Sequence, residues 1–226
     1  MTTGDQVRWD RQHAAGHGSN HASGFLKEIL LSDSWPIPRG RALDIATGKG
    51  RNAIFLAEQG FDVVAIDVSP VALDEARQRA AGKSLWSPTG KTVAPSNTPV
   101  GGNPEREPPA KAGDRVEGSI SWQQADLERI ELPEATYDLV VDFNYLQRSL
   151  IPQIKAALKP GGHVIFETYL IGQEILGHPK NPAYLLRHNE LLELFRDFRV
   201  LCYREGKFSA GEETAFRAGI LAEKPK

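Results

Sequence analysis

The 226-residue sequence has a single cysteine, Cys202, and no apolar run long enough to cross a bilayer. One cysteine excludes an intrachain disulfide and favours a reducing compartment. The first residues, MTTGDQVRWDRQ, lack the apolar core of a secretory signal. These absences predict a cytoplasmic protein without a membrane partner.

An excess of either charge is also lacking. The 27 Lys and Arg residues nearly cancel the 29 Asp and Glu residues, which leaves a net charge of −2. Such a balance offers no electrostatic footprint for DNA or RNA, and we expect no nucleic-acid partner. The length suits a single α/β domain, 1–226, with a large core.

What the chain does have is a nucleotide-binding pattern between residues 41 and 67. Residues 42–45 predict a buried parallel strand. Gly48 and Gly50 then let the backbone turn tightly and come close to a ligand. Good helix formers follow over residues 52–59, so a strand, a turn and a helix come in the order that a nucleotide cradle requires.

A carboxylate closes this pattern. Residues 61–66 predict a second buried strand, and Asp67 emerges at its carboxyl end, where open α/β sheets bind ligands. A carboxylate there suits a ribose diol, because it accepts charge-assisted hydrogen bonds from both hydroxyls.

Two cofactors fit such a cradle. Gly48, Gly50 and Ala53 satisfy the GxGxxG/A fingerprint, and Asp67 lies near the expected offset, so NAD stays open on spacing alone. Asp44 favours a cationic ligand instead, because it ends the first strand where it would repel a pyrophosphate. S-adenosylmethionine carries both an ammonium and a sulfonium. The alternative for Asp44 is a cap on its own turn.

Several motifs together extend this pattern. Residues 44–50, DIATGKG, look like a D/ExGxGxG turn in which Ala46 replaces the first glycine. Residues 124–127 look like the segment after a third strand, residues 137–142 like a fourth strand, and residues 158–162 like the LkPGG turn before a fifth. In this order the motifs resemble the class I S-adenosylmethionine-dependent methyltransferases.

The resemblance implies an α/β fold: a Rossmann-like, seven-stranded, mostly parallel sheet with helices on both faces and the last strand antiparallel. It also implies S-adenosylmethionine as cofactor, with Asp67 at the ribose and Asp126 near the adenine. The predicted cofactor site comprises Asp44, Ala46, Thr47, Gly48, Gly50, Asn52, Asp67, Val68, Asp126, Leu127 and Asp142.

Within the superfamily the chain looks most similar to the tellurite-resistance and thiopurine-type small-molecule methyltransferases. The segments that carry this likeness are Trp9–Arg11, the string GRNAIFLAEQGFDVVAIDVSPVALDEA, and Asn144–Arg148. The likeness implies a small-molecule methyl acceptor.

The remaining chain predicts further elements. Ser69 as N-cap and Pro70 as first residue favour a helix over residues 70–81. Residues 189–198 predict another helix, and residues 200–203 and 214–222 predict two strands. Residues 1–35 are read as an amino-terminal cap segment. The Pro- and Gly-rich insertion at 83–118 is read as a flexible surface loop, with a lid as the alternative.

The amino-terminal segment is the first of three loops that this fold would gather over the methyl group. His13, His17 and His21 recur every four residues, which raises the possibility of a metal site. Gly16 and Gly18 disfavour a continuous helix there, so we expect no metal. A mobile flap with His13 or His17 in acid–base chemistry is preferred.

Substrate contacts are also expected from aromatic and amide side chains. Trp9 would stack on cofactor or substrate, or else anchor its segment. Tyr145 follows the fourth strand in an order that resembles the D/NPPY motif without its prolines. Tyr169, Asn181 and Tyr184 lie in the loop after the fifth strand, together with His178.

Arg148 is predicted to anchor an anionic substrate, because a guanidinium pairs bidentately with oxyanions. A surface ion pair is the alternative.

The sequence therefore predicts an S-adenosylmethionine-dependent methyltransferase that acts on a small-molecule nucleophile, as a monomer or homodimer. Two alternatives remain open: a NAD-dependent oxidoreductase, and a catalytically silent S-adenosylmethionine-binding protein.

Overall fold

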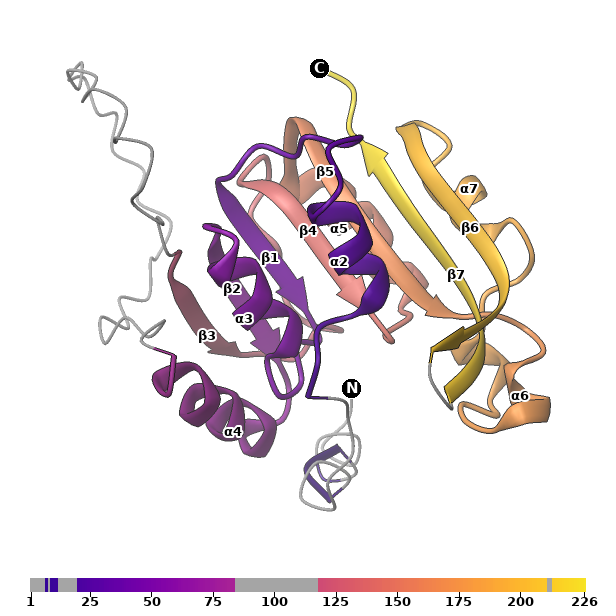
Figure 1. The fold of residues 1–226 in the computed structure, drawn as a ribbon, viewed down its shortest axis with the longest axis horizontal. Helices are drawn as coiled ribbons and strands as arrows, with labels where there is room; N and C mark the ends of the chain where they lie inside the picture. The colour runs from indigo at the N-terminus through magenta and orange to yellow at the C-terminus, as the bar shows by residue number, and fades with distance from the viewer. Residues whose placement is uncertain (1–6, 8, 12–19, 84–117, 211–212) are drawn as a thin grey trace.

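The computed structural model describes residues 7, 9–11, 20–83, 118–210 and 213–226 (Figure 1). The insertion between Lys83 and Gly118, and with it the choice between a loop and a lid, lies outside the described residues, as do His13 and His17.

One seven-stranded sheet organises the described chain, in the order β3-β2-β1-β4-β5-β7-β6. Neighbouring strands from β3 to β5 are parallel, whereas β7 runs antiparallel to both β5 and β6. The strands are β1 (Arg41–Ile45), β2 (Asp62–Asp67), β3 (Ile120–Gln124), β4 (Tyr137–Phe143), β5 (Leu158–Tyr169), β6 (Arg199–Ala210) and β7 (Glu213–Glu223). The predicted fold class, including the antiparallel last strand, is confirmed.

Helices cover both faces of the sheet (Figure 1). They are α2 (Gly24–Leu30), α3 (Arg51–Glu58), α4 (Pro70–Ala81), α5 (Ile151–Ala157), α6 (Gln173–Leu176) and α7 (Glu190–Leu194), with 3-10 turns η1 (Arg148–Leu150) and η2 (Pro182–Tyr184). On one face, α2 and α3 pack against Leu139 and Ile165; on the other, α5 and α7 pack against Val140 and Phe166. Burial on both faces explains the nearly continuous apolar strands.

The helix over residues 70–81 is found as predicted. The Ser69 hydroxyl accepts a hydrogen bond from the Ala72 N–H at 3.1 Å, and Pro70 occupies the first turn, where no N–H is needed.

Two elements near the carboxyl terminus differ from the sequence prediction. The helix predicted over residues 189–198 ends at Leu194, and a turn follows in which the Phe198 N–H bonds to the Phe195 carbonyl at 2.9 Å. Both phenylalanines are buried, with ring centroids 5.7 Å apart, and the tighter turn brings both rings into the core. Strand β5 already begins at Leu158, within the segment 158–162 that was predicted as a turn before it, because Leu158 pairs with Tyr137.

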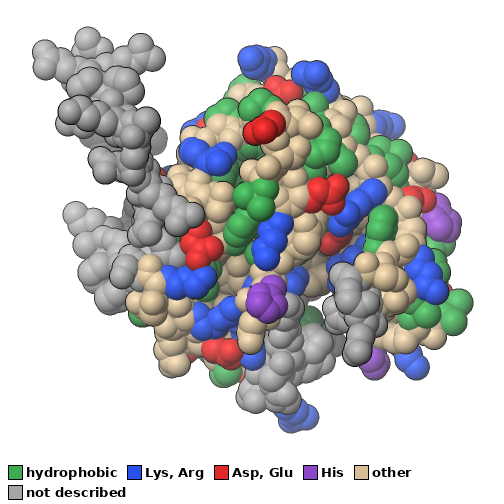
Figure 2. All heavy atoms as spheres, viewed as in Figure 1, with side chains coloured by type: hydrophobic (Ala, Val, Ile, Leu, Met, Phe, Trp, Pro, Cys, Tyr) green, Lys and Arg blue, Asp and Glu red, His purple; other side chains and the backbone are tan. Residues whose placement is uncertain are grey.

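The surface shows no gathering of one charge on the face in Figure 2, where basic and acidic side chains are interspersed. Within the described ranges, no helix is both long and apolar enough to span a membrane.

Candidate active site

The carboxyl ends of β1, β2 and β4 bring three predicted carboxylates to one edge of the sheet. Ile45 pairs with Ile66 and with Asp142, so Asp44, Asp67 and Asp142 end neighbouring strands. This edge is where open α/β sheets bind ligands.

The Asp67 carboxylate is held by the two turns that flank it. Its Oδ2 accepts the Gly48 N–H at 2.8 Å, and its Oδ1 accepts the Ser69 N–H at 2.9 Å. Only 7% of Asp67 is exposed. Two backbone donors therefore fix the orientation of the carboxylate that is predicted to meet the ribose.

Glycine is required at Gly50. Its φ is +72°, and an added Cβ would lie 2.5 Å from Cη2 of Trp122 and 2.9 Å from Cβ of Ala76. Ala46 likewise has a positive φ, 50°, which explains why a glycine is usual in this turn.

Ala46→Gly is expected to leave the free energy of unfolding unchanged or to raise it by up to about 1 kcal/mol. A left-handed alanine costs roughly 1–2 kcal/mol, and the added freedom of glycine in the unfolded chain offsets part of this gain. Urea denaturation measures the effect. Ala156→Gly in α5 serves as control and should lower stability by about 0.5–1 kcal/mol. An equal loss in both variants would contradict strain at Ala46.

Asp44 is buried, and its Oδ2 accepts the Thr47 hydroxyl at 2.5 Å. Burial raises the pKa of Asp44 to about 7, against the lowering effects of the Thr47 hydrogen bond and of the Arg51 charge. The Asp44 carboxyl thus stabilises its own turn, which was the alternative interpretation from the sequence. When ionised, it can also offset the charge of a nearby cation.

Asp142 is 1% exposed, and its Oδ1 has no hydrogen-bond partner among the described residues. Burial, and then the charge of Asp44, raises the pKa of Asp142 well above its ordinary range. An unpartnered buried oxygen is rare and costly, so this position suits a ligand donor or cation.

The segment predicted to lie near the adenine follows β3. The Ala125 N–H donates to the Asp67 carbonyl at 3.0 Å, which places Asp126 beside the cradle, and the Asp126 carboxylate accepts the Glu128 N–H at 3.0 Å. Leu127 is buried, and the Val68 carbonyl accepts from the Gln124 side chain at 3.3 Å.

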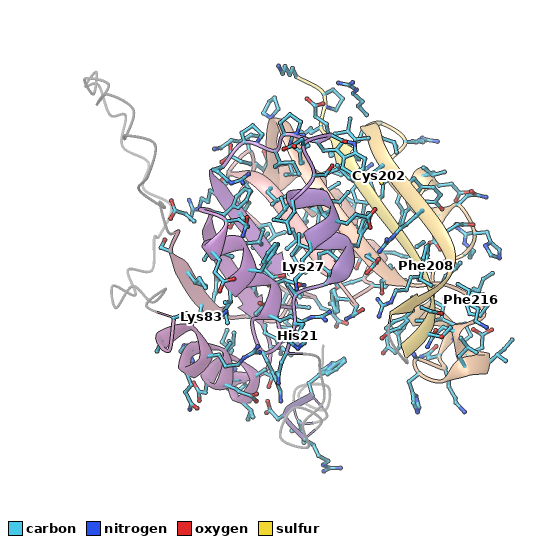
Figure 3. The ribbon with its side chains drawn as sticks, viewed as in Figure 1. His21, Lys27, Lys83, Cys202, Phe208 and Phe216 are labelled. Atoms are coloured by element: carbon cyan, nitrogen blue, oxygen red, sulfur yellow. The ribbon has the colours of Figure 1, made fainter. Side chains whose placement is uncertain are left out.

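The amino-terminal segment contacts the amino-terminal ends of α3 and α4, the helices that follow β1 and β2. Asp10 accepts a hydrogen bond from the Ser69 hydroxyl, and Ser23 donates its N–H to Asn52 Oδ1 at 2.9 Å. Asn52, predicted at the cofactor, thus uses this oxygen to tether the segment. Figure 3 shows His21 at this same end of the molecule.

Comparison with known proteins shows the family of the chain. The family described as "methyltransferase domain" matches residues 20–217. The chain belongs to this methyltransferase family. The predicted resemblance to class I S-adenosylmethionine-dependent methyltransferases is confirmed, with S-adenosylmethionine as the cofactor.

Individual relatives are distant. Hemagglutinin 1 of Eikenella corrodens is 25% identical over 196 residues, which is 84% of this chain but only 52% of that protein. The chain thus spans about half the length of this relative. The crystal structure of TehB from Haemophilus influenzae has a TM-score of 0.66 at 17% identity, covering 96% of this chain and 67% of that one. The crystal structure of the N-methyltransferase NodS from Bradyrhizobium japonicum WM9 has a TM-score of 0.60 at 17% identity, covering 98% of this chain and 99% of that one. At such low identities, the similarity to the two solved structures shows a shared fold alone.

The cradle of this methyltransferase fits its cofactor on two observations. A buried Asp142 oxygen lacks a hydrogen-bond partner among the described residues, and Gly50 holds a left-handed backbone, with φ of 72°, in the turn that follows β1. The two residues lie on neighbouring segments at the same sheet edge.

We expect the affinity of the methyltransferase for S-adenosylmethionine to fall about tenfold from pH 8 to pH 6. The cationic cofactor favours ionised Asp44, whose pKa is raised to about 7 in the free protein, so binding at lower pH requires loss of a proton. Calorimetric titration over this range measures the effect. Asp44→Asn should bind weakly with a flat profile; a flat wild-type profile would contradict the assignment.

Arg148 pairs with a buried carboxylate instead of facing the cradle. Its Nε and Nη2 donate to Glu190 Oε1 and Oε2 at 2.6 and 3.0 Å, and its Nη1 donates to the Ala183 carbonyl at 2.8 Å. A further bond joins Nη2 to the Leu185 carbonyl at 2.9 Å. Of the two sequence readings, this geometry favours the ion pair.

The other predicted substrate residues divide into two groups. Asn181 Oδ1 accepts the Ala183 N–H at 3.0 Å and so caps η2, and Tyr184 in that turn is 42% exposed. Tyr145 lies two residues after β4 and Tyr169 ends β5, so both lie at the carboxyl edge of the sheet. Burial, and then the Asp142 charge, raises the pKa of Tyr145, which keeps its hydroxyl protonated.

Arg51 and Arg217 reach the same edge and were not predicted from the sequence. Arg217 lies in β7 opposite Tyr169 of β5, with its guanidinium 4.4 Å from the centroid of the tyrosine ring. Only strand register places it there. Arg51 directly follows Gly50, so its position in the first turn of α3 was a usable signal.

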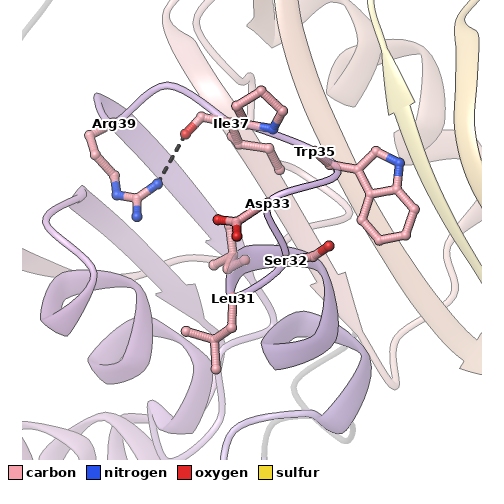
Figure 4. A pocket seen from close by; sticks show the side chains of 8 residues that line it. Leu31, Ser32, Asp33, Trp35, Ile37 and Arg39 are labelled. Atoms are coloured by element: carbon pink, nitrogen blue, oxygen red, sulfur yellow. Dashed lines mark hydrogen bonds between the residues drawn. The ribbon is translucent and has the colours of Figure 1, made fainter.

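A separate pocket opens at the far end of the sheet (Figure 4). It is lined by residues between α2 and β1, including Leu31, Trp35 and Arg39, and Arg39 donates to the Ile37 carbonyl at 3.0 Å. Because these residues precede β1, the pocket lies away from the carboxyl edge of the sheet.

Proposed function

We propose that this methyltransferase transfers the methyl group of S-adenosylmethionine to a small-molecule nucleophile by in-line displacement. The observation that carries the proposal is the pair of buried carboxyls at neighbouring strand ends, Asp44 and Asp142, beside a glycine turn. Such a pair suits a cationic cofactor and would repel a pyrophosphate. This disfavours the NAD alternative.

When bound, the cofactor supplies a methyl group that its sulfonium already activates. The protein then has to hold the nucleophile about 3–3.5 Å from the methyl carbon and in line with it, an effect that can contribute roughly 7–11 kcal/mol. Asp67 and Asp126 orient the nucleoside, and Asp44 and Asp142 offset positive charge.

The small size of the acceptor is supported by the surface. The charges are interspersed on the face in Figure 2, and the net charge is −2, so neither observation favours a nucleic-acid acceptor. Trp9 stays a proposed contact of the amino-terminal segment, and His13 or His17 a proposed acid–base group. Cytoplasmic location and a monomeric or homodimeric state remain predictions.

Thermal unfolding with S-adenosylhomocysteine, S-adenosylmethionine and NADH tests the cofactor. A ligand at 100 times its dissociation constant adds about 2.7 kcal/mol of stability. We expect stabilisation by the adenosyl ligands and none by NADH; the reverse result would support hydride transfer.

Turnover is tested separately with a panel of thiol, amine, phenol and oxyanion acceptors, by release of S-adenosylhomocysteine. Cofactor binding without release across the panel would support the catalytically silent alternative.

A further inference from the structure

Basic side chains gather beside the acidic cradle, on the β5–β7 side of the same sheet edge. Arg217 stacks on Tyr169 and donates from Nη1 to Asn144 Oδ1 at 2.6 Å. Asn144 directly follows β4, and its N–H is bound by the Glu167 carbonyl at 3.0 Å. These contacts hold the Arg217 guanidinium at the edge.

Arg51 lies at the same edge, in the first turn of α3. It is half-buried, and its one hydrogen bond within the described chain joins Nη1 to the His21 carbonyl at 3.3 Å. Burial lowers the pKa of Arg51, and the positive charge of Arg217 lowers it further. The contacts link the two groups: the Ser23 hydroxyl donates to Glu167 Oε1 at 3.3 Å, the same oxygen lies 3.7 Å from Arg217 Nη1, and the Arg51 partner His21 lies two residues before Ser23. Each guanidinium has five N–H donors and uses few of them within the described chain, an arrangement that an anion would stabilise.

Neighbouring carboxylates do not cancel this charge. Arg204 is paired with Glu167 at 2.7 Å and with Glu28 at 2.9 Å. Glu167 also lies 3.7 Å from Arg217. Three guanidiniums against two carboxylates leave one positive charge, and Asp44, whose pKa is raised to about 7, offsets it only in part at neutral pH.

We propose that Arg51 and Arg217 bind an oxyanion of the methyl acceptor, such as a carboxylate, sulfate or phosphate group. The proposal rests on the proposed function and narrows its acceptor to anionic molecules. Tyr169 and Asn144 position Arg217 within this site. The acidic cradle then holds the cationic cofactor, and the basic site beside it holds the anionic methyl acceptor.

The carboxylate of the cofactor is a second source of the same chemistry. We assign the site to the acceptor because Arg217 lies on β7, beyond β4 and β5 from the β1–β2 cradle. The carboxylates predicted at the cofactor, Asp44 and Asp67, end β1 and β2 instead.

The test titrates the protein saturated with S-adenosylhomocysteine against sulfate, phosphate and benzoate, with benzamide as a neutral match for benzoate. Calorimetry should show saturable binding of at least one oxyanion and none of benzamide. Arg217→Gln and Arg51→Gln should weaken it at least tenfold, and Arg217→Lys less. Arg199→Gln, at the far edge of the sheet, serves as control and should bind as wild type.

Three results would overturn the assignment. One is the absence of saturable oxyanion binding by the loaded wild type, and another is unchanged binding in folded Arg217→Gln. The third is a tenfold loss of S-adenosylhomocysteine affinity in Arg217→Gln, which would show that the guanidinium binds the carboxylate of the cofactor. Failure of the wild type to bind S-adenosylhomocysteine at all would instead refute the proposed function.

Discussion

Asp67→Ala should weaken binding of S-adenosylhomocysteine by about 4 kcal/mol, roughly a thousandfold, while the domain stays folded. Each charge-assisted hydrogen bond to a ribose hydroxyl contributes about 1.5–3 kcal/mol, and one carboxylate can accept two. The backbone donors of Gly48 and Ser69 already fix its orientation, so little ordering is needed on binding. Calorimetric titration gives the affinity, and circular dichroism reports the fold.

Controls separate ligand contact from damage to the turn. Asp67→Asn keeps a carbonyl acceptor and should retain more affinity than alanine. Asp74→Ala, an exposed residue of α4, should bind as wild type. Undiminished affinity in folded Asp67→Ala would remove this residue from the site.

Arg148→Gln should lower the free energy of unfolding by about 3 kcal/mol at pH 7. The Glu190 side chain is 3% exposed, and removal of its partner leaves a buried carboxylate without its counter-charge. The expected loss lies at the low end for such pairs because the Arg148 side chain is 39% exposed. Urea denaturation measures it, and Arg77→Gln, in an exposed pair with Asp74, should change stability by less than about 0.5 kcal/mol.

The pH dependence gives this prediction a second readout. The Arg148 hydrogen bond lowers the pKa of Glu190 to about 2, below its ordinary value of 4.5. The pair thus stabilises the fold fully above pH 4.5, and this contribution is lost as pH falls toward 2. The gap between wild type and Arg148→Gln should therefore narrow in acid; a gap that does not depend on pH would argue against the ion pair.

The parts of the site that could be predicted are formed by residues that lie close together in the sequence. Asp44, Gly50 and Asp67 belong to one strand–turn–helix–strand unit, so their spacing fixes their meeting at one edge. Ser69 caps its helix through a neighbour only three residues away. Local geometry alone dictates such contacts.

Contacts between distant segments could not be predicted in this way. Arg148 meets Glu190 across 42 residues, and Arg217 meets Asn144 across 73. Both depend on how strands pair and on the path of the chain after β5. A single sequence shows that an arginine is present but not which carboxylate or amide faces it.

The two buried carboxyls at the strand ends also affect the protein outside catalysis. Removing Asp44 and Asp142 from water makes the protein less stable when its cradle is empty, and a cationic ligand relieves that penalty. Proteases in the cell remove the unfolded fraction. The abundance of this methyltransferase should therefore track the metabolic supply of its methyl donor.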